Sequence, residues 1–372
     1  MKIAIHASDL DQNRIDGTRV YMFSMLKNFG VLDRENSFCI YHERNFNPLL
    51  APPVFENYIV KQIPLRYFWT QVRFAFEIFR DKPDVLWMPM HNVPFFRRKK
   101  LKVVVTIHDL AFKIFPDYFP KKDLAKLNFL TDHAVESADR IIAVSEVTKK
   151  DILKFYPEIS AEKISVIHHG FDGELFEKKV PENEAEKILK TCDLVPKSYL
   201  LYVGAIQPRK NLGILIEAFE KIKESNPELK LVFAGAPAWK AEQTFAKINE
   251  CKFKEDIIIT GTVPFSHLPI FYQNALTFVF PSLYEGFGIP VLEALASGAP
   301  VILADNSSLP EVAGDSALYF DTQNSSDLAR KIDMVLKDEN LRNELLEKGK
   351  KRVADYSLEK CAKQTLDALL NW

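Results

Sequence analysis

Short apolar runs, separated by segments of helix length, recur along the first half of the chain. Most of them are rich in valine and isoleucine and do not alternate with polar residues, which is typical of parallel strands buried on both faces. Amphipathic stretches between several of them, such as 121–138 and 146–156, predict helices. The alternation predicts an α/β domain with a doubly wound parallel sheet. Its expected strands are residues 2–7, 37–42, 84–88, 103–108, 140–145 and 163–168.

The same pattern starts again after a polar, proline-containing segment. The 372 residues therefore predict two Rossmann-like domains, 1–172 and 198–357, joined by a linker at 173–197. A last helix at about 358–372 has no strand after it and is expected to return to the first domain. Ligands bind at the carboxyl ends of such strands, so two facing sheets predict one cleft between the domains. The second series comprises strands 198–204, 230–234, 256–260, 276–280 and 300–304, with helices at about 211–225, 289–297 and 325–337.

The densest candidate motif is 281–298, where a predicted strand runs into a loop and then a helix. Gly286 and Gly288 in the loop let a ligand approach the backbone, and free N–H groups at a helix start bind phosphate. Glu285 lies in the loop and Glu293 in the helix, eight residues on. One carboxylate can then meet a sugar and the other the ribose hydroxyls, with a diphosphate between them. The alternative is a plain strand–loop–helix unit with two incidental glutamates.

A cationic pair, Arg209 and Lys210, stands between the first strand and the first helix of the second domain. A nucleoside diphosphate needs positive charge at this position, and more of it as the diphosphate leaves. Arginine offers a planar fork of donors and lysine a point charge. The alternative is a solvated basic turn.

These motifs resemble those of the large retaining glycosyltransferase family with the GT-B fold, the glycosyl transferases group 1. The segment 281–298 is similar to the family's Glu-x7-Glu motif, and 204–211 to its Gly-x4-Arg-Lys-Asn pattern. Gly-Ala-Pro-Val-Ile at 298–302 and Leu-Pro-Glu-Val at 309–312 fit as well. The resemblance covers nearly the whole chain, and it is strongest over 198–315. It implies two Rossmann-like domains facing a cleft.

The resemblance also implies roles for residues of the second domain. Arg209 and Lys210 would hold the donor diphosphate, Glu285 the transferred sugar and Glu293 the ribose. The loop 261–264 would lie against the nucleobase. The donor loops would further contribute Val263, Phe287, Gly288 and Ile289.

In the first domain, the segment 106–112 resembles the family's His-Asp-Leu stretch. His108 would then contact the transferred sugar, and Asp109 follows it on the acceptor side. Gly17 would present its backbone to the diphosphate, although relatives usually carry a second glycine in that loop. Ser145 is expected either to cap the next helix or to serve the acceptor.

No metal or other cofactor is expected. Asp9-x-Asp11 resembles the metal-binding pattern of a different fold but falls in the wrong domain for the donor phosphates, and His168-His169 has no third ligand at suitable spacing. Arg209 and Lys210 would do the electrostatic work of a metal. The four scattered cysteines form no CxxC pair and fit a reducing cytoplasm. A net charge of −1 argues against nucleic acid as a partner.

The segment 65–80 carries aromatic residues and three arginines at helical spacing, and Arg-Arg-Lys-Lys follows at 97–100. Two interpretations stay open: a core helix with a solvated face, or peripheral contact with the inner face of an anionic membrane. No apolar run reaches the 18 residues of a spanning helix, and Asp9 and Asp11 come too early for a signal peptide. The expected location is cytoplasmic.

The predicted activity is transfer of a hexose from a nucleotide-sugar to a glycan or lipid-linked saccharide acceptor, with retention of configuration. GDP-mannose is the first expected donor, and UDP-glucose and UDP-N-acetylglucosamine follow. Three alternatives stay open: an inverting transfer with Asp109 as general base, a nucleotide-sugar epimerase, and a catalytically silent nucleotide- or glycan-binding protein.

Overall fold

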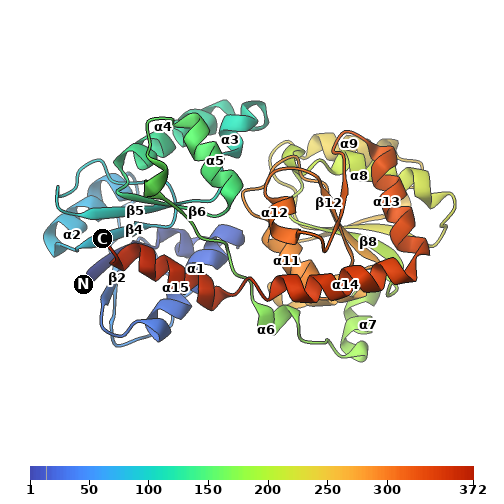
Figure 1. Cartoon of the computed structure of the whole chain (residues 1–372), viewed down its shortest axis with the longest axis horizontal. Coiled ribbons are helices and arrows are strands. Elements are labelled where there is room, and N and C mark those ends of the chain that lie inside the picture. Colours follow the sequence, from blue (N-terminus) through green and yellow to red (C-terminus); the bar gives the residue numbers. More distant parts are fainter. Residues whose placement is uncertain (14) are drawn as a thin grey trace. The chain divides into compact units, whose positions relative to one another are not determined.

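The computed structural model describes residues 1–13 and 15–372, which divide into two compact units. The first unit comprises Met1–Pro116, Pro120–Gly170 and Leu358–Trp372, and the second comprises Asp117–Phe119 and Phe171–Ser357. Each unit is built around one parallel β-sheet with flanking helices (Figure 1). This confirms the predicted α/β class with two doubly wound sheets.

The sheet of the first unit has seven strands in the order β3-β2-β1-β4-β5-β6-β7. Strand β1 pairs with β2 on one side and with β4 on the other, so the chain winds in both directions from β1. The edge strand β3 escaped prediction because its residues are exposed or half-buried and give no buried apolar run. The strands are β1 Lys2–His6, β2 Ser37–His42, β3 Tyr58–Gln62, β4 Val85–Met88, β5 Lys102–Ile107, β6 Arg140–Ala143 and β7 Ile164–Val166.

The sheet of the second unit has six strands in the order β10-β9-β8-β11-β12-β13. Strand β8 has the place that β1 has in the first sheet, between β9 and β11. The three-residue edge strand β13 is too short to leave a pattern in the sequence. The strands are β8 Tyr199–Val203, β9 Lys230–Ala234, β10 Ile257–Gly261, β11 Thr277–Phe280, β12 Val301–Ala304 and β13 Leu318–Phe320.

Helices connect the strands of both sheets (Figure 1). Those of the first unit are α1 Gly17–Leu32, α2 Ala75–Asp81, α3 Ala111–Ile114, α4 Lys121–Ser137, α5 Glu146–Phe155 and α15 Leu358–Leu370. Those of the second unit are α6 Gly173–Phe176, α7 Glu182–Thr191, α8 Leu212–Lys223, α9 Glu242–Glu250, α10 Leu268–Asn274, α11 Ile289–Ala296, α12 Leu309–Ala313, α13 Ser325–Lys337 and α14 Glu339–Val353.

The last helix, α15, packs on α1 of the first unit, and the two lie side by side in Figure 1. Its apolar face, which includes Cys361, Ala362 and Leu369, is buried in the same core as β1. Arg140 on β6 stabilises the C-terminal end of α15, because its guanidinium donates to the carbonyl of Ala368 at 2.7 Å.

The segment 173–197, predicted as a linker, is part of the second unit and contains two helices, α6 and α7. Phe176 is fully buried, with its ring against those of Phe265 and Tyr272. The amino-acid sequence of this segment is mostly polar because α7 buries only two side chains, those of Ala185 and Leu189. The boundary between the units falls at Phe171.

Candidate functional site

The strand order of the second sheet reverses between β8 and β11, and in such sheets ligands bind at the carboxyl ends of the strands where this reversal occurs. Arg209 and Lys210 lie beyond β8 in the 3₁₀-helix Pro208–Lys210. Glu285 lies in the loop that follows β11. Two segments 75 residues apart thus meet at one edge of the sheet.

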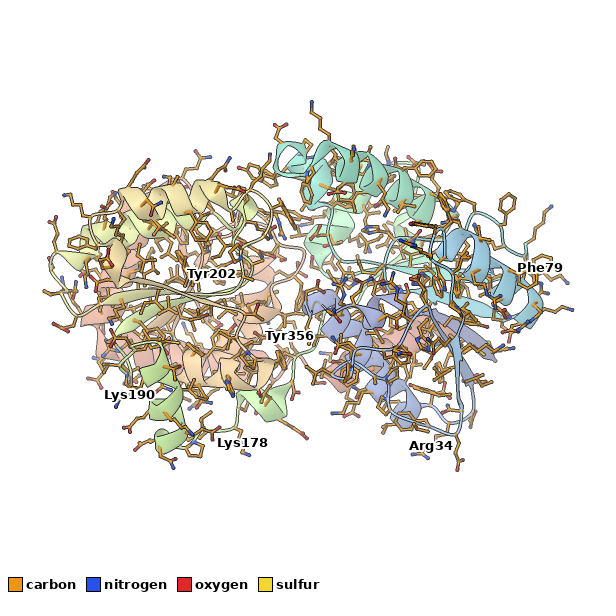
Figure 2. All side chains as sticks on the ribbon, turned by 180° about the vertical axis from the view of Figure 1, so that it is seen from behind. Arg34, Phe79, Lys178, Lys190, Tyr202 and Tyr356 are labelled. Carbon is orange, nitrogen blue, oxygen red and sulfur yellow. The ribbon has the colours of Figure 1, made fainter. Side chains whose placement is uncertain are left out.

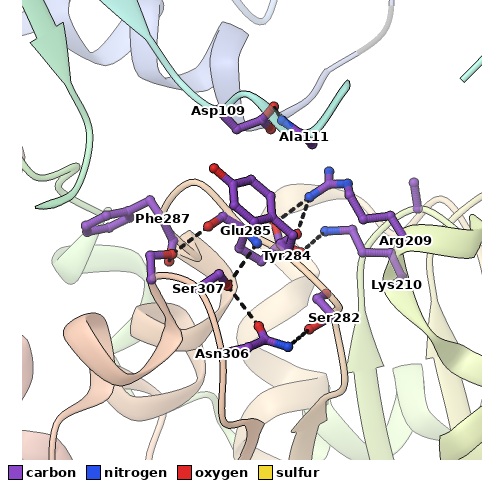
Figure 3. A network of polar contacts seen from close by, with 12 residues as sticks. Asp109, Ala111, Arg209, Lys210, Ser282, Tyr284, Glu285, Phe287, Asn306 and Ser307 are labelled. Atoms are coloured by element: carbon purple, nitrogen blue, oxygen red, sulfur yellow. Dashed lines mark hydrogen bonds and ion pairs between the residues drawn. The ribbon is translucent and has the colours of Figure 1, made fainter. Parts of the chain in front are cut away.

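The two cations hold the carboxylate of Glu285 between them (Figure 3). Lys210 Nζ lies 2.5 Å from Glu285 Oε1, and Arg209 Nη1 lies 3.3 Å from Oε2. The same Arg209 nitrogen donates to the carbonyl of Tyr284. The side chains of Arg209, Lys210 and Glu285 are only 10–12% exposed. With two positive charges against one negative, the cluster keeps one net positive charge, which suits an anionic ligand.

The charge state of Glu285 follows from these neighbours. Burial alone would raise the pKa of its carboxyl, but the charges of Lys210 and Arg209 and the hydrogen bond from Lys210 together bring that pKa below its usual value. Glu285 is therefore ionised at neutral pH, where it can accept hydrogen bonds from sugar hydroxyls.

The segment after β12 holds the Glu285 loop in place (Figure 3). The Ser307 hydroxyl accepts a hydrogen bond from the backbone N–H of Glu285 at 3.1 Å and donates to Asn306, which in turn donates to the carbonyl of Ser282. The Ser308 hydroxyl lies 2.9 and 2.7 Å from the carbonyls of Glu285 and Phe287. These residues were not predicted as part of a site, and their hydrogen bonds position the carboxylate without touching it.

Glu293 lies on α11 and is buried beside Tyr272, whose hydroxyl donates to Glu293 Oε2 at 3.0 Å. Burial raises the pKa of Glu293 to about 7, although the hydrogen bond from Tyr272 works against the rise. A ligand that offers two hydroxyls would stabilise the charged form, because each hydroxyl would donate to a carboxylate oxygen. The sequence predicted Glu293 but not its partner Tyr272.

Replacing Glu293 with glutamine is expected to stabilise the ligand-free protein above pH 7. The folded-state pKa lies above the usual value of 4.5, so the folded state holds a proton that the unfolded state has lost, and wild-type stability falls as pH rises from 4.5 to about 7. Glutamine mimics the protonated form, so the gain should reach roughly 3 kcal/mol at pH 8 and vanish near pH 4.5.

The measurement is the difference in Tm between Glu293→Gln and wild type across this pH range. Glu228→Gln, a change of the same kind on the surface of the second unit, is the control and should give no gain at any pH. A Glu293→Gln difference that does not change with pH would contradict the buried, raised carboxyl.

The remaining predicted donor residues fall into two groups. Phe287, Gly288 and Ile289 lead from the Glu285 loop into α11, and Gly288 has a φ of 113°, which favours glycine. Phe287 is buried against the ring of Tyr356. Val263 follows β10 and is half-buried, and among the described residues it takes no part in the Glu285 network.

His108 of the first unit directly follows β5, and both of its ring nitrogens have partners. Nε2 lies 2.9 Å from the carbonyl of Pro89, which can only accept, so Nε2 carries the proton. Nδ1 then accepts from His169 Nε2 at 3.3 Å. Burial lowers the pKa of His108 and lowers that of His169 further, so both rings are neutral at pH 7. The adjacent histidines 168 and 169 had been interpreted as structural, and the contact of His169 with His108 was missed.

The other predicted residues of the first unit make local contacts. Asp109 Oδ1 accepts from the backbone N–H of Ala111 at 3.0 Å, at the start of α3. Ser145 caps α5, because its hydroxyl accepts from the N–H of Thr148 at 3.0 Å. A helix cap was one of the two roles predicted for this residue. Gly17 is the exposed first residue of α1, where the carboxylate of Asp16 caps the helix. The structure thus gives Asp109 and Ser145 structural roles at helix starts.

The Asp9-x-Asp11 pattern also has a structural role. Asp11 Oδ2 accepts from the backbone N–H groups of Glu43 and Arg44 at 2.8 and 2.7 Å, and Oδ1 lies 3.2 Å from His42. Asp9 lies 3.7 Å from the guanidinium of Arg19. Over residues 1–13 and 15–372, no three histidine, cysteine or acidic side chains cluster in a way that could hold a metal ion.

Two sequence families match this chain. The family described as Glycosyl transferases group 1 matches residues 193–352, and the family described as Glycosyltransferase Family 4 matches residues 30–175. The first match includes the whole Arg209–Lys210–Glu285 cluster, and the second includes His108 and Asp109.

Several relatives of this chain are named as bacterial mannosyltransferases. O-antigen chain mannosyltransferase B of Escherichia coli is 29% identical over 293 residues, which cover 78% of this chain and 75% of that protein. O-antigen chain mannosyltransferase RfbU of Salmonella typhimurium is 31% identical over 230 residues, 62% of this chain and 58% of that protein. Serotype-specific mannosyltransferase WbdA of E. coli is 30% identical, but the aligned region is only 31% of its length.

Solved structures share the fold along the whole chain at low sequence identity. Anabaena HepE, in complex with UDP and glucose, superposes with a TM-score of 0.76 at 17% identity and full coverage of both chains. Sucrose-phosphate synthase of Thermosynechococcus elongatus gives a TM-score of 0.77 at 19% identity, with 98% of this chain and 97% of that chain covered.

Proposed function

We propose that this chain, whose residues 193–352 match the glycosyl transferases group 1, transfers a mannosyl residue from GDP-mannose to a saccharide acceptor, with retention of configuration and without a metal ion. The observation that carries the proposal is the buried Arg209–Lys210–Glu285 cluster at the carboxyl ends of β8 and β11. It offers positive charge to a diphosphate and an ionised carboxylate to a sugar in one place.

The choice of mannose is supported by the names of the relatives, three of which are mannosyltransferases. Two of those names mention the O-antigen chain, which supports a glycan or lipid-linked saccharide as acceptor. A uridine nucleotide is the second candidate, because HepE was solved with UDP and with UDP-glucose. At 15–17% identity that likeness shows the fold alone, so GDP-mannose stays first.

In the proposed reaction, the acceptor oxygen forms a bond to the anomeric carbon as the bond from that carbon to the diphosphate oxygen breaks. Charge then grows on the diphosphate, where Arg209 and Lys210 would stabilise it in a largely buried site. The acceptor proton goes to an oxygen of the leaving diphosphate. Glu285 would orient the sugar by accepting from its hydroxyls, and Glu293 would accept from the ribose.

The residues of the first unit have supporting parts in this proposal. His108 is neutral and ordered by Pro89 and His169, so it would meet the sugar as a fixed, uncharged surface. An inverting route with Asp109 as general base is the less favoured alternative, because that carboxylate already accepts a hydrogen bond from the backbone N–H of Ala111.

The test is a transfer assay with labelled GDP-mannose, UDP-glucose and UDP-N-acetylglucosamine and a lipid-linked saccharide extract, run in EDTA and in Mg²⁺. We expect transfer from GDP-mannose at the same rate in both buffers, and an α-linked product by NMR. An EDTA-sensitive rate would refute metal independence, and a β-linked product would refute retention. Conversion of the donor sugar without acceptor would indicate an epimerase, and binding without turnover a silent protein.

A further inference from the structure

The surface of the first unit displays phenylalanine side chains to solvent. Six phenylalanines of the described residues are exposed, and all six belong to the segments 65–96 and α4. Phe96 is 83% exposed and Phe68 78%. Singly exposed apolar residues are ordinary, but a contiguous group of large ones marks an interaction surface. The six are Phe68, Phe76, Phe79, Phe95, Phe96 and Phe129.

Part of the group forms a stripe along one helical segment, which runs through the π-helical turn Thr70–Phe74 into α2. Val72, Phe76 and Phe79 are exposed, and their spacing of four and three residues places them on one side of this helical segment. The exposed Phe68 lies just before it, with a φ of 54°. Trp69, Phe74 and Ile78 face the core on the other side. Figure 2 shows Phe79 at the outer edge of this unit. The segment therefore has two apolar faces, and only one of them is covered.

Neighbouring segments extend the stripe. The side chain of Gln71 accepts from the backbone N–H of Phe95 at 2.9 Å and donates to the carbonyl of Val93, which fixes the loop that carries Phe95 and Phe96 beside the helix. The ring of Phe95 lies 5.5 Å from that of Phe129 on α4. One ordered surface thus unites the helix, the loop and α4.

The chain segment that carries five of these phenylalanines is strongly basic. Residues 64–102 contain nine lysines and arginines but only three acidic residues, in a chain whose net charge is −1. Glu77 is buried and is engaged by Arg73 and Arg80. In the part of the chain that the structure describes, the ion pairs of this segment involve Arg73, Arg80 and Lys102, and no acidic side chain lies within ion-pair distance of Arg98, Lys99 or Lys100.

We propose that this aromatic–basic surface, made of Phe68, Phe76, Phe79, Phe95, Phe96 and the basic run 97–100, binds the surface of an anionic lipid membrane. Phenylalanine rings settle into the boundary between headgroups and acyl chains, while lysine and arginine attract anionic headgroups. A twofold contact with a second copy would set this basic surface against itself, which charge repulsion disfavours. No helix of the described residues is long and apolar enough to cross a bilayer.

The test is co-sedimentation of the purified chain with vesicles of phosphatidylcholine alone and of phosphatidylcholine mixed with phosphatidylglycerol. We expect binding to the mixed vesicles that weakens as salt is added. Phe76→Ser with Phe79→Ser should lower the partition coefficient at least tenfold. Arg98→Gln, Lys99→Gln and Lys100→Gln together should remove the preference for the anionic lipid. Arg97 is left unchanged because its guanidinium supports the carbonyls of Pro94 and Ser137.

Val54→Ser is the matched control, since Val54 is 98% exposed on the same unit but lies outside this surface. It should bind vesicles as the wild type does, and an unchanged Tm for each variant shows that it is folded. Wild-type protein that does not bind mixed vesicles, or that binds them equally without Phe76 and Phe79, overturns the proposal. A dimer in light scattering that these serine substitutions dissociate, without vesicle binding, would assign the surface to a second copy instead.

Discussion

Turnover is expected to fall by about 10²- to 10³-fold when Arg209 or Lys210 is replaced by glutamine, because each would lose a donor aimed at charge that develops on the leaving diphosphate. Both side chains are largely buried, so water cannot readily take the place of the lost hydrogen-bond donor. The affinity for a nucleoside diphosphate should fall as well, and that for the corresponding monophosphate much less. The measurements are kcat for diphosphate release with saturating substrates and Kd for both nucleotides by calorimetry.

Lys247→Gln is the control for these two variants. Lys247 is also a lysine paired with a glutamate of the second unit, Glu217, but that pair is about half exposed. Surface ion pairs contribute little, so activity and nucleotide affinity should stay at wild-type values. If Arg209→Gln and Lys210→Gln behave like Lys247→Gln, the cluster does not hold the diphosphate.

Glu285→Gln is expected to abolish detectable transfer while leaving diphosphate binding intact or tighter. The substitution removes the negative charge, so the cluster goes from one net positive charge to two. It also breaks a buried ion pair, which typically costs about 3–5 kcal/mol of stability. Arg209 and Lys210 variants should lose diphosphate affinity, and Glu285→Gln should not, so diphosphate affinity distinguishes the two kinds of variant.

The stability cost of Glu285→Gln should depend on pH. Because the folded-state pKa lies below the usual value of 4.5, the charged carboxylate contributes stability above that pH, and the contribution is lost as pH falls through the folded-state pKa. The cost, measured as a Tm difference from wild type, should therefore shrink in acid. Ser308→Ala is the matched control, since it removes hydrogen bonds to the same loop but no charge. Equal behaviour of the two variants across pH would contradict an ionised Glu285.

Most of the fold could be predicted from the sequence because buried parallel strands leave uninterrupted apolar runs. Strand β9 falls at the predicted residues, and β8 and β11 lie within one or two residues of prediction. The edge strands β3 and β13 could not be found, since an exposed or very short strand has no such run. The polar segment 173–197 looked like a linker because composition does not reveal that Phe176 is buried against Phe265 and Tyr272.

The candidate site was predictable only as far as its local motifs. Glu285, Glu293, Arg209 and Lys210 stand in recognisable strand–loop–helix patterns, so each could be named. That Glu285 pairs with both cations depends on β8 and β11 being neighbours in the sheet, and a linear pattern does not contain that strand order. Ser307, Ser308 and His169 act through single hydrogen bonds across loops. Such contacts leave no periodic signal.

The claim that a nucleoside diphosphate binds at the carboxyl ends of β8 and β11 is tested most directly by calorimetric titration of GDP, UDP and GMP into the intact chain in EDTA. We predict that one diphosphate, GDP first, binds more tightly than GMP, that Arg209→Gln and Lys210→Gln weaken it strongly, and that Glu285→Gln retains it. Folded wild-type protein that binds neither diphosphate, or diphosphate binding that survives the loss of both Arg209 and Lys210, would contradict the assignment of this site.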